Sequence, residues 1–231
     1  MVIHKIKIRD LPKIFNASSS NIDFPKSMQV KDGSLTSLKE FEALVSLCKL
    51  SNPKNIFEIG TFEGYSTYTL VKNSEDSIIY TLDLPNKNII LKYNVGDLNQ
   101  KYISQNKQII FLNKIEKSRI KQLYGDSAVF DFKKFYDKMD FIFIDGSHTY
   151  EYTKNDTEKA FKMIRKNGVV VWHDYNPKYW KGTVKYLDEL ALTKNLYHIE
   201  DTYLVFYKIQ DTNEVLKINK ELKKNQKGGQ K

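Results

Sequence analysis

Short apolar runs alternate with amphipathic stretches along most of the chain. The runs that predict strands lie at residues 55–60, 77–84, 119–127, 140–146, 169–175, 196–201 and 203–209. Apolar positions at helical spacing predict helices at residues 38–50, 61–72, 153–167 and 183–192. Strands that alternate with helices are typical of an α/β fold with a doubly wound, mostly parallel sheet.

Local signals mark several element ends. Ser37 and Glu40 have the spacing of a capping box in front of the first helix, and Gly168 stands where the third predicted helix would end. The last two strands follow each other with no helix between them, which predicts an antiparallel hairpin at one edge of the sheet. Residues 86–118 show only patches of either period, so their element boundaries stay open.

The size and composition fit one large α/β domain. The chain has 231 residues, of which 41% are hydrophobic and 28% charged. No apolar run approaches the roughly 20 residues of a membrane helix, and residues 1–13 lack a signal-peptide core, so we expect a cytoplasmic protein without membrane contact. We expect residues 51–210 to form the domain, residues 1–50 a helical segment that packs on it, and residues 211–231 a basic, flexible tail.

The formal net charge of +9 comes mainly from the two ends of the chain. Residues 217–231 carry +5 and residues 1–13 carry +3, which leaves +1 for all the residues between them. A nearly neutral body is not the basic surface that nucleic-acid binding needs, so nucleic acid is not expected as a partner. The single cysteine, Cys48, lies on the apolar side of a predicted helix and is expected to be a core residue.

Polar residues gather at the ends of the predicted strands. In a doubly wound sheet, ligands bind outside the carboxyl ends of the strands. The polar residues at those ends are Glu58, Gly60, Asp83, Asp126, Ser127, Asp145, Gly146, Ser147, His148, His173 and Asp174. We therefore expect these residues to meet at one rim of the sheet.

The first strand runs into a glycine loop whose spacing excludes one common cofactor class. Gly60 and Gly64 are four residues apart, whereas a dinucleotide fold needs G-x-G-x-x-G to place a pyrophosphate at a helix N-terminus. Glycines here would let a ligand lie against the backbone, with Glu58 as the acceptor for a cationic amine. Asp83 follows Gly60 by 23 residues, near the place of an acid that accepts from ribose hydroxyls. A nucleoside that carries a positive charge and no pyrophosphate satisfies both observations.

Four motifs resemble those of class I S-adenosylmethionine-dependent methyltransferases. FEIGTFEGYS (57–66) is similar to the first motif of that superfamily. Three further stretches resemble the branch that includes catechol O-methyltransferase and the macrolide-sugar O-methyltransferases, namely LYGDS (123–127), DFIFIDGSHTYEY (140–152) and NGVVVWHDY (167–175). The resemblance covers about residues 35–210 and implies a Rossmann-like, seven-stranded sheet whose last strand is antiparallel.

The resemblance also implies how S-adenosyl-L-methionine is bound. Residues of the first motif would surround its methionine part, Asp83 would bind its ribose hydroxyls, and Asp126 with Ser127 would lie near its adenine. The complete set that the resemblance implies is Glu58, Gly60, Thr61, Gly64, Ser66, Asp83, Asp126, Ser127 and Asp145. Relatives often associate, so a homo-oligomer is a further expectation.

A divalent metal ion, usually magnesium, is bound beyond the fourth and fifth strands in that branch, and the matching positions here are Asp145, His173 and Asp174. Magnesium prefers oxygen ligands, so His173 either lies outside the ligand set or favours manganese, iron or zinc. His148 stands at the place of a general base, which makes His148 and Asp145 the implied catalytic residues. The ordinary histidine pKa of about 6.5 would leave His148 largely neutral at pH 7, ready to take the proton of a metal-bound hydroxyl that attacks the sulfonium methyl.

These residues favour metal-assisted O-methylation of a hydroxyl on a small molecule or sugar. The alternative is a metal-independent methyltransferase of the same fold, directed at nitrogen or oxygen, followed by a non-catalytic nucleotide-binding protein. A nucleic-acid amino-methyltransferase would carry an Asp/Asn-Pro-Pro-aromatic motif where this chain has DGSH (145–148). Specificity rests on the N-terminal segment and residues 86–118, so the substrate stays open.

Overall fold

The computed structural model describes residues 3–17, 37–85, 90–95 and 114–209. Its helices are α1 (Leu11–Ile14), α2 (Leu38–Ser51), α3 (Tyr65–Lys72), α5 (Lys114–Arg119), α6 (Tyr150–Met163) and α7 (Lys181–Leu190), with the short 3-10 helices η1 (Ile8–Asp10) and η2 (Lys133–Phe135). Its strands are β1 (His4–Ile6), β2 (Asn55–Ile59), β3 (Ile78–Asp83), β4 (Ile120–Tyr124), β5 (Met139–Ile144), β6 (Ile164–Trp172), β7 (Tyr197–Ile199) and β8 (Val205–Lys208).

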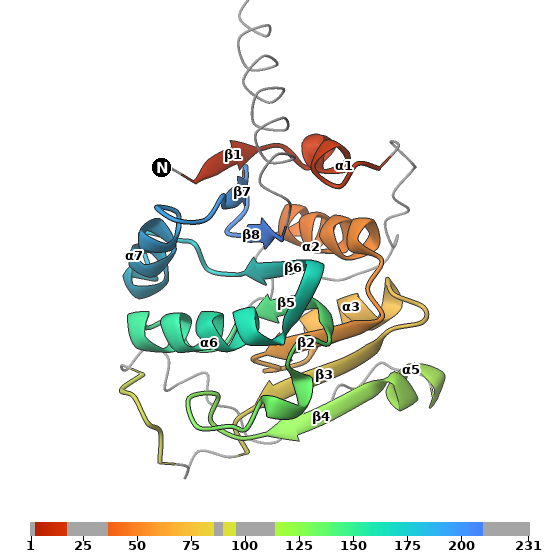
Figure 1. Ribbon diagram of the computed structural model, residues 1–231, viewed down its shortest axis with the longest axis vertical. Coiled ribbons are helices and arrows are strands. Elements are labelled where there is room, and N and C mark those ends of the chain that lie inside the picture. The colour runs from red at the N-terminus through yellow and green to blue at the C-terminus, as the bar shows by residue number, and fades with distance from the viewer. Residues whose placement is uncertain (1–2, 18–36, 86–89, 96–113, 210–231) are drawn as a thin grey trace, which may run out of the picture.

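All eight strands form one sheet in the order β1-β7-β8-β6-β5-β2-β3-β4 (Figure 1). β8 runs antiparallel to both of its neighbours, β6 and β7. The other pairs in the described sheet are parallel. The predicted mostly parallel α/β sheet with an antiparallel last strand is therefore confirmed.

Side chains of the central strands alternate between two hydrophobic layers. In β5, Phe141 and Phe143 pack in one layer with α2 and α3, while Ile142 and Ile144 pack in the other with α6 and α7. All four side chains are buried. A strand that is covered on both faces is apolar at successive positions, which explains the uninterrupted apolar run before Asp145.

The sheet has one more strand than the motifs implied. β1 pairs in parallel with β7, with His4 beside Tyr197 and Ile6 beside Ile199, and it forms the outer edge. β8 lies between β7 and β6, so the β7–β8 hairpin is one strand in from that edge. The predictions of a seven-stranded sheet and of a helical N-terminal segment did not include β1. A strand of three residues among charged neighbours is too short to show an alternation of apolar and polar positions.

The helix that was predicted to end at Gly168 ends earlier. α6 stops at Met163, and β6 starts at Ile164. The backbone N–H groups of Asp137 and Lys138 donate to the last carbonyl groups of α6, so the final turn is satisfied from outside the helix. Gly168 is not a helix cap but lies inside β6, where an added Cβ would come within 2.6 Å of the Ile164 side chain.

α2 begins at the predicted N-cap, but the side chain of Glu40 reaches another part of the chain. The Ser37 hydroxyl accepts a hydrogen bond from the backbone N–H of Glu40 at 3.2 Å. The Glu40 carboxylate is buried and accepts from the backbone N–H of Tyr203 at 2.8 Å. Glu40 thus ties α2 to the segment between β7 and β8. Cys48, on the same helix, is fully buried, as expected of a core residue.

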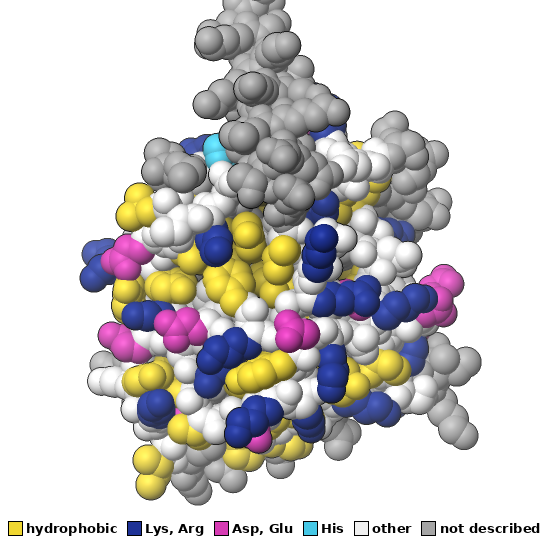
Figure 2. Space-filling view, viewed as in Figure 1, with side chains coloured by type: hydrophobic (Ala, Val, Ile, Leu, Met, Phe, Trp, Pro, Cys, Tyr) yellow, Lys and Arg dark blue, Asp and Glu magenta, His cyan; other side chains and the backbone are white. Residues whose placement is uncertain are grey.

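Several predictions fall outside the described residues. They concern the tail over 211–231 and most of the region 86–118, of which the structure describes residues 90–95 and the part from α5 onward. Among the described residues, no helix is both long and apolar enough to cross a membrane. On the described part of the face in Figure 2, Lys and Arg side chains lie scattered among acidic and apolar ones and form no continuous basic stripe.

Candidate active site

Backbone hydrogen bonds place the segments beyond the strand ends next to each other. The N–H of Asp145, just after β5, donates to Ile59 at the end of β2 at 2.8 Å. The N–H of His173, just after β6, donates to Ile144 at the end of β5 at 3.0 Å. The carboxyl ends of these strands therefore meet at one rim, as predicted.

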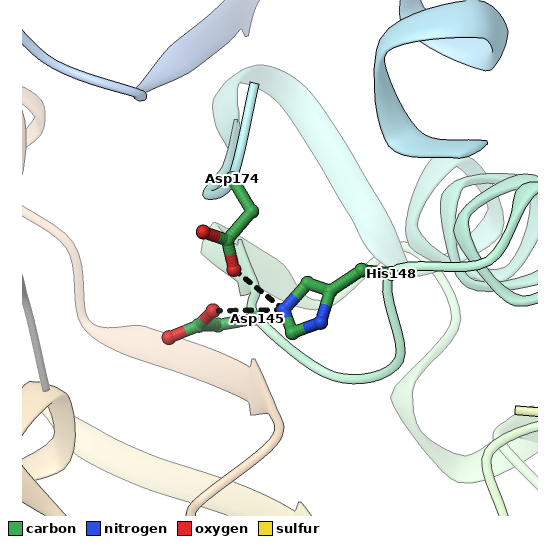
Figure 3. Close-up of side chains that lie close together, drawn as sticks. All are labelled: Asp145, His148 and Asp174. Carbon is green, nitrogen blue, oxygen red and sulfur yellow. Dashed lines mark ion pairs between the residues drawn. The ribbon is translucent and has the colours of Figure 1, made fainter. Parts of the chain in front are cut away.

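Three side chains beyond β5 and β6 converge on one point (Figure 3). One ligand atom each of Asp145, His148 and Asp174 lies within 4.8 Å of the other two. The Nε2 atom of His148 is 2.5 Å from Asp174 Oδ2 and 4.0 Å from Asp145 Oδ1. All three side chains are partly buried. Two carboxylates and an imidazole nitrogen thus form a compact group that is largely shielded from water.

His173 joins this group from the buried side. Its Nδ1 atom lies 3.0 Å from Asp145 Oδ1 and 3.4 Å from Asp174 Oδ2. Its Nε2 atom lies 3.5 Å from the Oε1 atom of Glu40. The His173 side chain is only 7% exposed, so it connects the charged group at the rim with a buried acid of α2.

The backbone at Asp174 is in the left-handed region, with a φ of 61°. Side chains of successive residues in a regular strand point to opposite faces of the sheet. Here both His173 and Asp174 lie close to Asp145. The chain turns at Asp174, whose carbonyl group accepts from the N–H of Asn176 at 2.7 Å. A non-glycine residue in this conformation is held there by its surroundings, and such residues are frequent at functional sites.

The carboxylates change the proton affinity of both histidines. Burial lowers the pKa of His148, but the charges of Asp174 and Asp145 and the contact with Asp174 at 2.5 Å outweigh it and raise that pKa to about 9. The same balance raises the pKa of His173 well above its ordinary value. Burial raises the pKa of Asp174, yet the neighbouring histidines overcome this and lower it below its ordinary range. This arrangement of side chains therefore favours a protonated His148, whereas a largely neutral one was expected from the sequence, and its role as general base stays a prediction.

The group has the donor chemistry of a divalent metal site. Two carboxylates this close together repel each other unless positive charge lies between them, and protonated histidines supply that charge in the arrangement described. A divalent ion could take over this task. Carboxylate oxygens suit every common divalent ion, whereas imidazole nitrogens suit manganese, iron, cobalt and zinc better than magnesium. Asp145 and Asp174, with a histidine nitrogen, therefore fit such an ion.

Glu58 lies beneath the glycine loop rather than at its surface. Its side chain is fully buried and accepts hydrogen bonds from the hydroxyl groups of Thr67 and, at 2.6 Å, Thr81. Burial raises its pKa to about 7, although hydrogen bonds from hydroxyl groups, including that of Ser66, act in the opposite direction. The carboxyl group thus shapes the floor of the loop, and its predicted role as acceptor for a cationic amine stays a prediction.

The loop after β2 needs glycine for a reason that the sequence does not show. Gly60 has a φ of 96°, and an added Cβ would lie 2.1 Å from the carbonyl oxygen of Asp145. Gly60 is thus packed against Asp145, the residue that follows the neighbouring strand β5. Gly64, with a φ of 78°, precedes the first turn of α3. Thr61 and Ser66 are both buried, and the Thr61 hydroxyl lies 2.6 Å from that of Thr81.

The acids at the ends of β3 and β4 are bonded to backbone groups. Asp83 accepts from the N–H of Phe62 at 2.9 Å and from the N–H of Leu84 at 2.8 Å. Asp126 accepts from the N–H groups of Lys92 and Ala128, each at 2.9 Å. Both carboxylates therefore hold loops in place at the rim. The roles expected of Asp83 toward the ribose, and of Asp126 and the buried Ser127 toward the adenine, stay predictions.

Three residues near the site were not singled out in these roles from the sequence. Glu40 reaches His173 from α2, and Trp180 packs its ring 4.0 Å from the ring of His148. Asp156 is buried under Gly146, and burial raises its pKa to about 7. Glu40 and Asp156 each lie on the apolar face of a helix, and an acid in such a position is the one sequence signal that could have indicated their burial near the site.

Comparison with known proteins identifies the family of the chain. The family described as a methyltransferase domain matches residues 57–175, which run from within β2 to just beyond β6 and include Asp145, His148, His173 and Asp174 but not Glu40. Caffeoyl-CoA O-methyltransferase 2 of Petunia hybrida is 26% identical over 170 residues, which cover 73% of this chain and 64% of the relative. The uncharacterized protein R132 of Acanthamoeba polyphaga mimivirus is 28% identical over 131 residues, which cover 55% of this chain and 54% of the relative. The chain therefore spans less than two thirds of the length of either relative.

Solved structures share the fold at low sequence identity. A Staphylococcus aureus protein assigned to the caffeoyl-CoA O-methyltransferases has a TM-score of 0.55 at 18% identity, over 77% of this chain and 85% of that one. The O-methyltransferase from Bacillus cereus, solved in complex with SAH, has a TM-score of 0.50 at 20% identity, over 76% of this chain and 82% of that one. The chain therefore belongs to the methyltransferase domain family, which confirms the resemblance of its motifs to class I S-adenosylmethionine-dependent methyltransferases.

Proposed function

We propose that the protein transfers a methyl group from S-adenosyl-L-methionine to a hydroxyl group of a small molecule or sugar with the help of a divalent metal ion. The observation that carries the proposal is the convergence of Asp145, His148 and Asp174 beside the loop that follows β2. Gly60 in that loop packs against the carbonyl group of Asp145. A cofactor that lies along the loop would thus end next to the charged group.

The loops at the ends of β2, β3 and β4 support a nucleoside cofactor. The hydrogen bond from Phe62 to Asp83 joins the glycine loop to the end of β3, and Asp126 holds residues 90–95 over the end of β4. These hydrogen bonds hold the described loops in place beside one another, as the binding of a ligand without a pyrophosphate would require. The Bacillus cereus methyltransferase, which has the same fold, was solved with SAH. We assign the cofactor to this half of the rim.

Asp145 and Asp174 would hold the metal ion, with a histidine nitrogen as a further ligand. A divalent ion at this place would lower the pKa of a substrate hydroxyl and fix its orientation. The carboxylates are already oriented for the task, because His173 contacts both of them and the left-handed turn at Asp174 faces them toward each other. The chain contributes the geometry and the negative charge.

His148 would take the proton of the substrate hydroxyl. The ring of Trp180 packs against it and limits its position. Positive charge bound to the two carboxylates would cancel the effect that raises the His148 pKa, so the imidazole could accept a proton near pH 7. As the hydroxyl oxygen bonds to the methyl carbon, the carbon–sulfur bond breaks, which gives the methyl ether, S-adenosylhomocysteine and protonated His148.

One observation favours a metal-independent reaction as the second candidate. His148 Nε2 lies 2.5 Å from Asp174 Oδ2, which is the geometry of a histidine oriented by a carboxylate. Such a pair could accept a substrate proton at Nδ1 without a metal ion. In that case the chelation of divalent ions would leave methyl transfer unchanged.

Isothermal titration with S-adenosylhomocysteine, in the presence of EDTA and again with manganese or magnesium, tests the proposal. We expect binding of the nucleoside in each case and binding of one divalent ion per chain. Turnover is then followed as S-adenosylhomocysteine release over a panel of phenols, catechols and sugars, with and without EDTA. The absence of nucleoside binding would contradict the cofactor assignment, and turnover that persists in EDTA would favour the metal-independent reaction.

A further inference from the structure

A buried acid far from the rim in sequence contacts the charged group. Glu40 is 1% exposed and lies in the first turn of α2, outside the residues that match the methyltransferase domain family. Burial of a carboxylate costs several kcal/mol unless partners compensate for the lost water. The backbone N–H of Tyr203 is one such partner, at 2.8 Å. The second neighbour is the imidazole of His173, at 3.5 Å.

The ring of His173 has one nitrogen toward Glu40 and the other toward the rim. Nε2 faces Glu40, while Nδ1 lies 3.0 Å from Asp145 Oδ1 and 3.4 Å from Asp174 Oδ2. With a divalent ion in place of the proton on Nδ1, the remaining ring N–H at Nε2 would face the charge of Glu40, 3.5 Å away, and the lone pair of Nδ1 would be free for the ion. Histidines that bind metal ions in proteins almost always donate their other N–H to such a partner, which fixes the tautomer and the orientation of the ring.

We propose that Glu40 is a positioning residue that holds His173 with Nδ1 toward Asp145 and Asp174, so that His173 becomes a nitrogen ligand and the site prefers manganese, cobalt or zinc over magnesium. The inference rests on the proposed metal site. It goes beyond it by assigning a role to α2 and by stating which ions the site selects. This arrangement lowers the affinity of the site for magnesium, because magnesium prefers oxygen ligands and binds imidazole weakly.

The substitution E40Q tests this role with little disturbance of the fold. Glutamine keeps the oxygen that accepts from Tyr203, but it removes the negative charge that faces His173. Glu42, two residues further along α2, is half-buried and lies outside these contacts, so E42Q is the matched control. Thermal melting of the three proteins shows whether each variant remains folded.

Calorimetric titration of the full chain, saturated with S-adenosylhomocysteine, then gives the affinity for manganese, cobalt and magnesium. We expect the wild type to bind manganese or cobalt at least tenfold more tightly than magnesium. E40Q should weaken manganese and cobalt binding by about 10-fold to 100-fold, the usual effect of removing such a partner, and leave the affinity for S-adenosylhomocysteine unchanged. E42Q should match the wild type in every measurement.

Pulsed electron paramagnetic resonance of the manganese-loaded protein identifies the nitrogen ligand. We expect nitrogen coupling in the wild type that H173N removes and H148A retains. Coupling that H148A removes and H173N retains would overturn the inference, and so would an E40Q affinity equal to that of the wild type. If the wild type binds S-adenosylhomocysteine but none of the ions, the proposed metal site fails together with this inference. If it binds ions but E40Q has no effect, the inference alone fails.

Discussion

The two halves of the rim carry the same kinds of polar residue and use them differently. At the ends of β2, β3 and β4, the acids accept hydrogen bonds from neutral donors of the protein itself. Hydroxyl groups donate to Glu58, and backbone N–H groups donate to Asp83 and Asp126. Beyond β5 and β6, Asp145 and Asp174 instead face the imidazoles of two histidines.

The first half of the rim therefore provides a fixed surface, and the second half provides concentrated negative charge. Hydrogen bonds to backbone groups fix the loops of the first half, so its residues build a surface on which a cofactor can lie. The second half concentrates two carboxylates whose repulsion must be balanced by positive charge, and this makes it suited to a cation. Substitutions in the second half should therefore change the chemistry, while substitutions in the first half should change stability.

The largest effect should come from D174N, which removes a carboxylate of the second half. A metal ion contributes several kcal/mol to the stabilisation of a transition state, so we expect kcat to fall about a thousandfold. Manganese binding should be lost within the range of a calorimetric titration, with binding of S-adenosylhomocysteine intact. A variant that keeps both its metal affinity and its rate would contradict the assignment of Asp174.

H148A should have the next largest effect. Loss of a general base lowers kcat by about a hundredfold or more. Metal and S-adenosylhomocysteine affinities should stay close to those of the wild type, since His148 acts on the substrate proton in this account. A loss of manganese affinity in H148A, measured by calorimetry, would make His148 a metal ligand instead of a base.

In the first half, E58Q should change how stability depends on pH. The folded-state pKa of Glu58 is raised to about 7, above its unfolded value, so its contribution to stability is present at low pH and is lost as pH rises through 7. A glutamine side chain cannot ionise, so the free energy of unfolding of E58Q should rise by about 2 to 3 kcal/mol relative to that of the wild type when the pH changes from 5 to 8. Urea unfolding at both values measures this difference, and parallel curves for the two proteins would show that Glu58 ionises normally.

The smallest effect should come from D126N. Asparagine keeps one acceptor oxygen and replaces the other with an amide, so one of the backbone hydrogen bonds to Lys92 and Ala128 is lost. We expect the free energy of unfolding to fall by about 1 to 2 kcal/mol, with the catalytic rate at saturating cofactor unchanged. A large fall in kcat instead would place Asp126 in the chemistry and break the division between the two halves.

The positions of the strand ends could be predicted because their signal is local. The apolar run before Asp145 and the turn after it identify a buried parallel strand and its carboxyl end from a few neighbouring residues. The sheet then brings Asp145, His148 and Asp174 together, since their strands are adjacent. The α/β fold could be predicted in the same way, from the spacing of apolar positions in alternating strands and helices.

The remaining features depend on contacts between distant residues. Glu40 and His173 are 133 positions apart, so no local pattern indicates that they meet. The raised pKa of His148 depends on charges that only the folded chain places beside it. β1 has three residues and becomes a strand by pairing with β7, and α6 ends early because Asp137 and Lys138 satisfy its carbonyl groups.

The central claim is that the second half of the rim binds a divalent ion beside the cofactor. Anomalous diffraction from crystals grown with manganese and S-adenosylhomocysteine tests it most directly. The account predicts a manganese peak bound by Asp145 and Asp174, with the nucleoside along the loop after β2. Clear density for the nucleoside, with no anomalous peak between these two carboxylates, would contradict it.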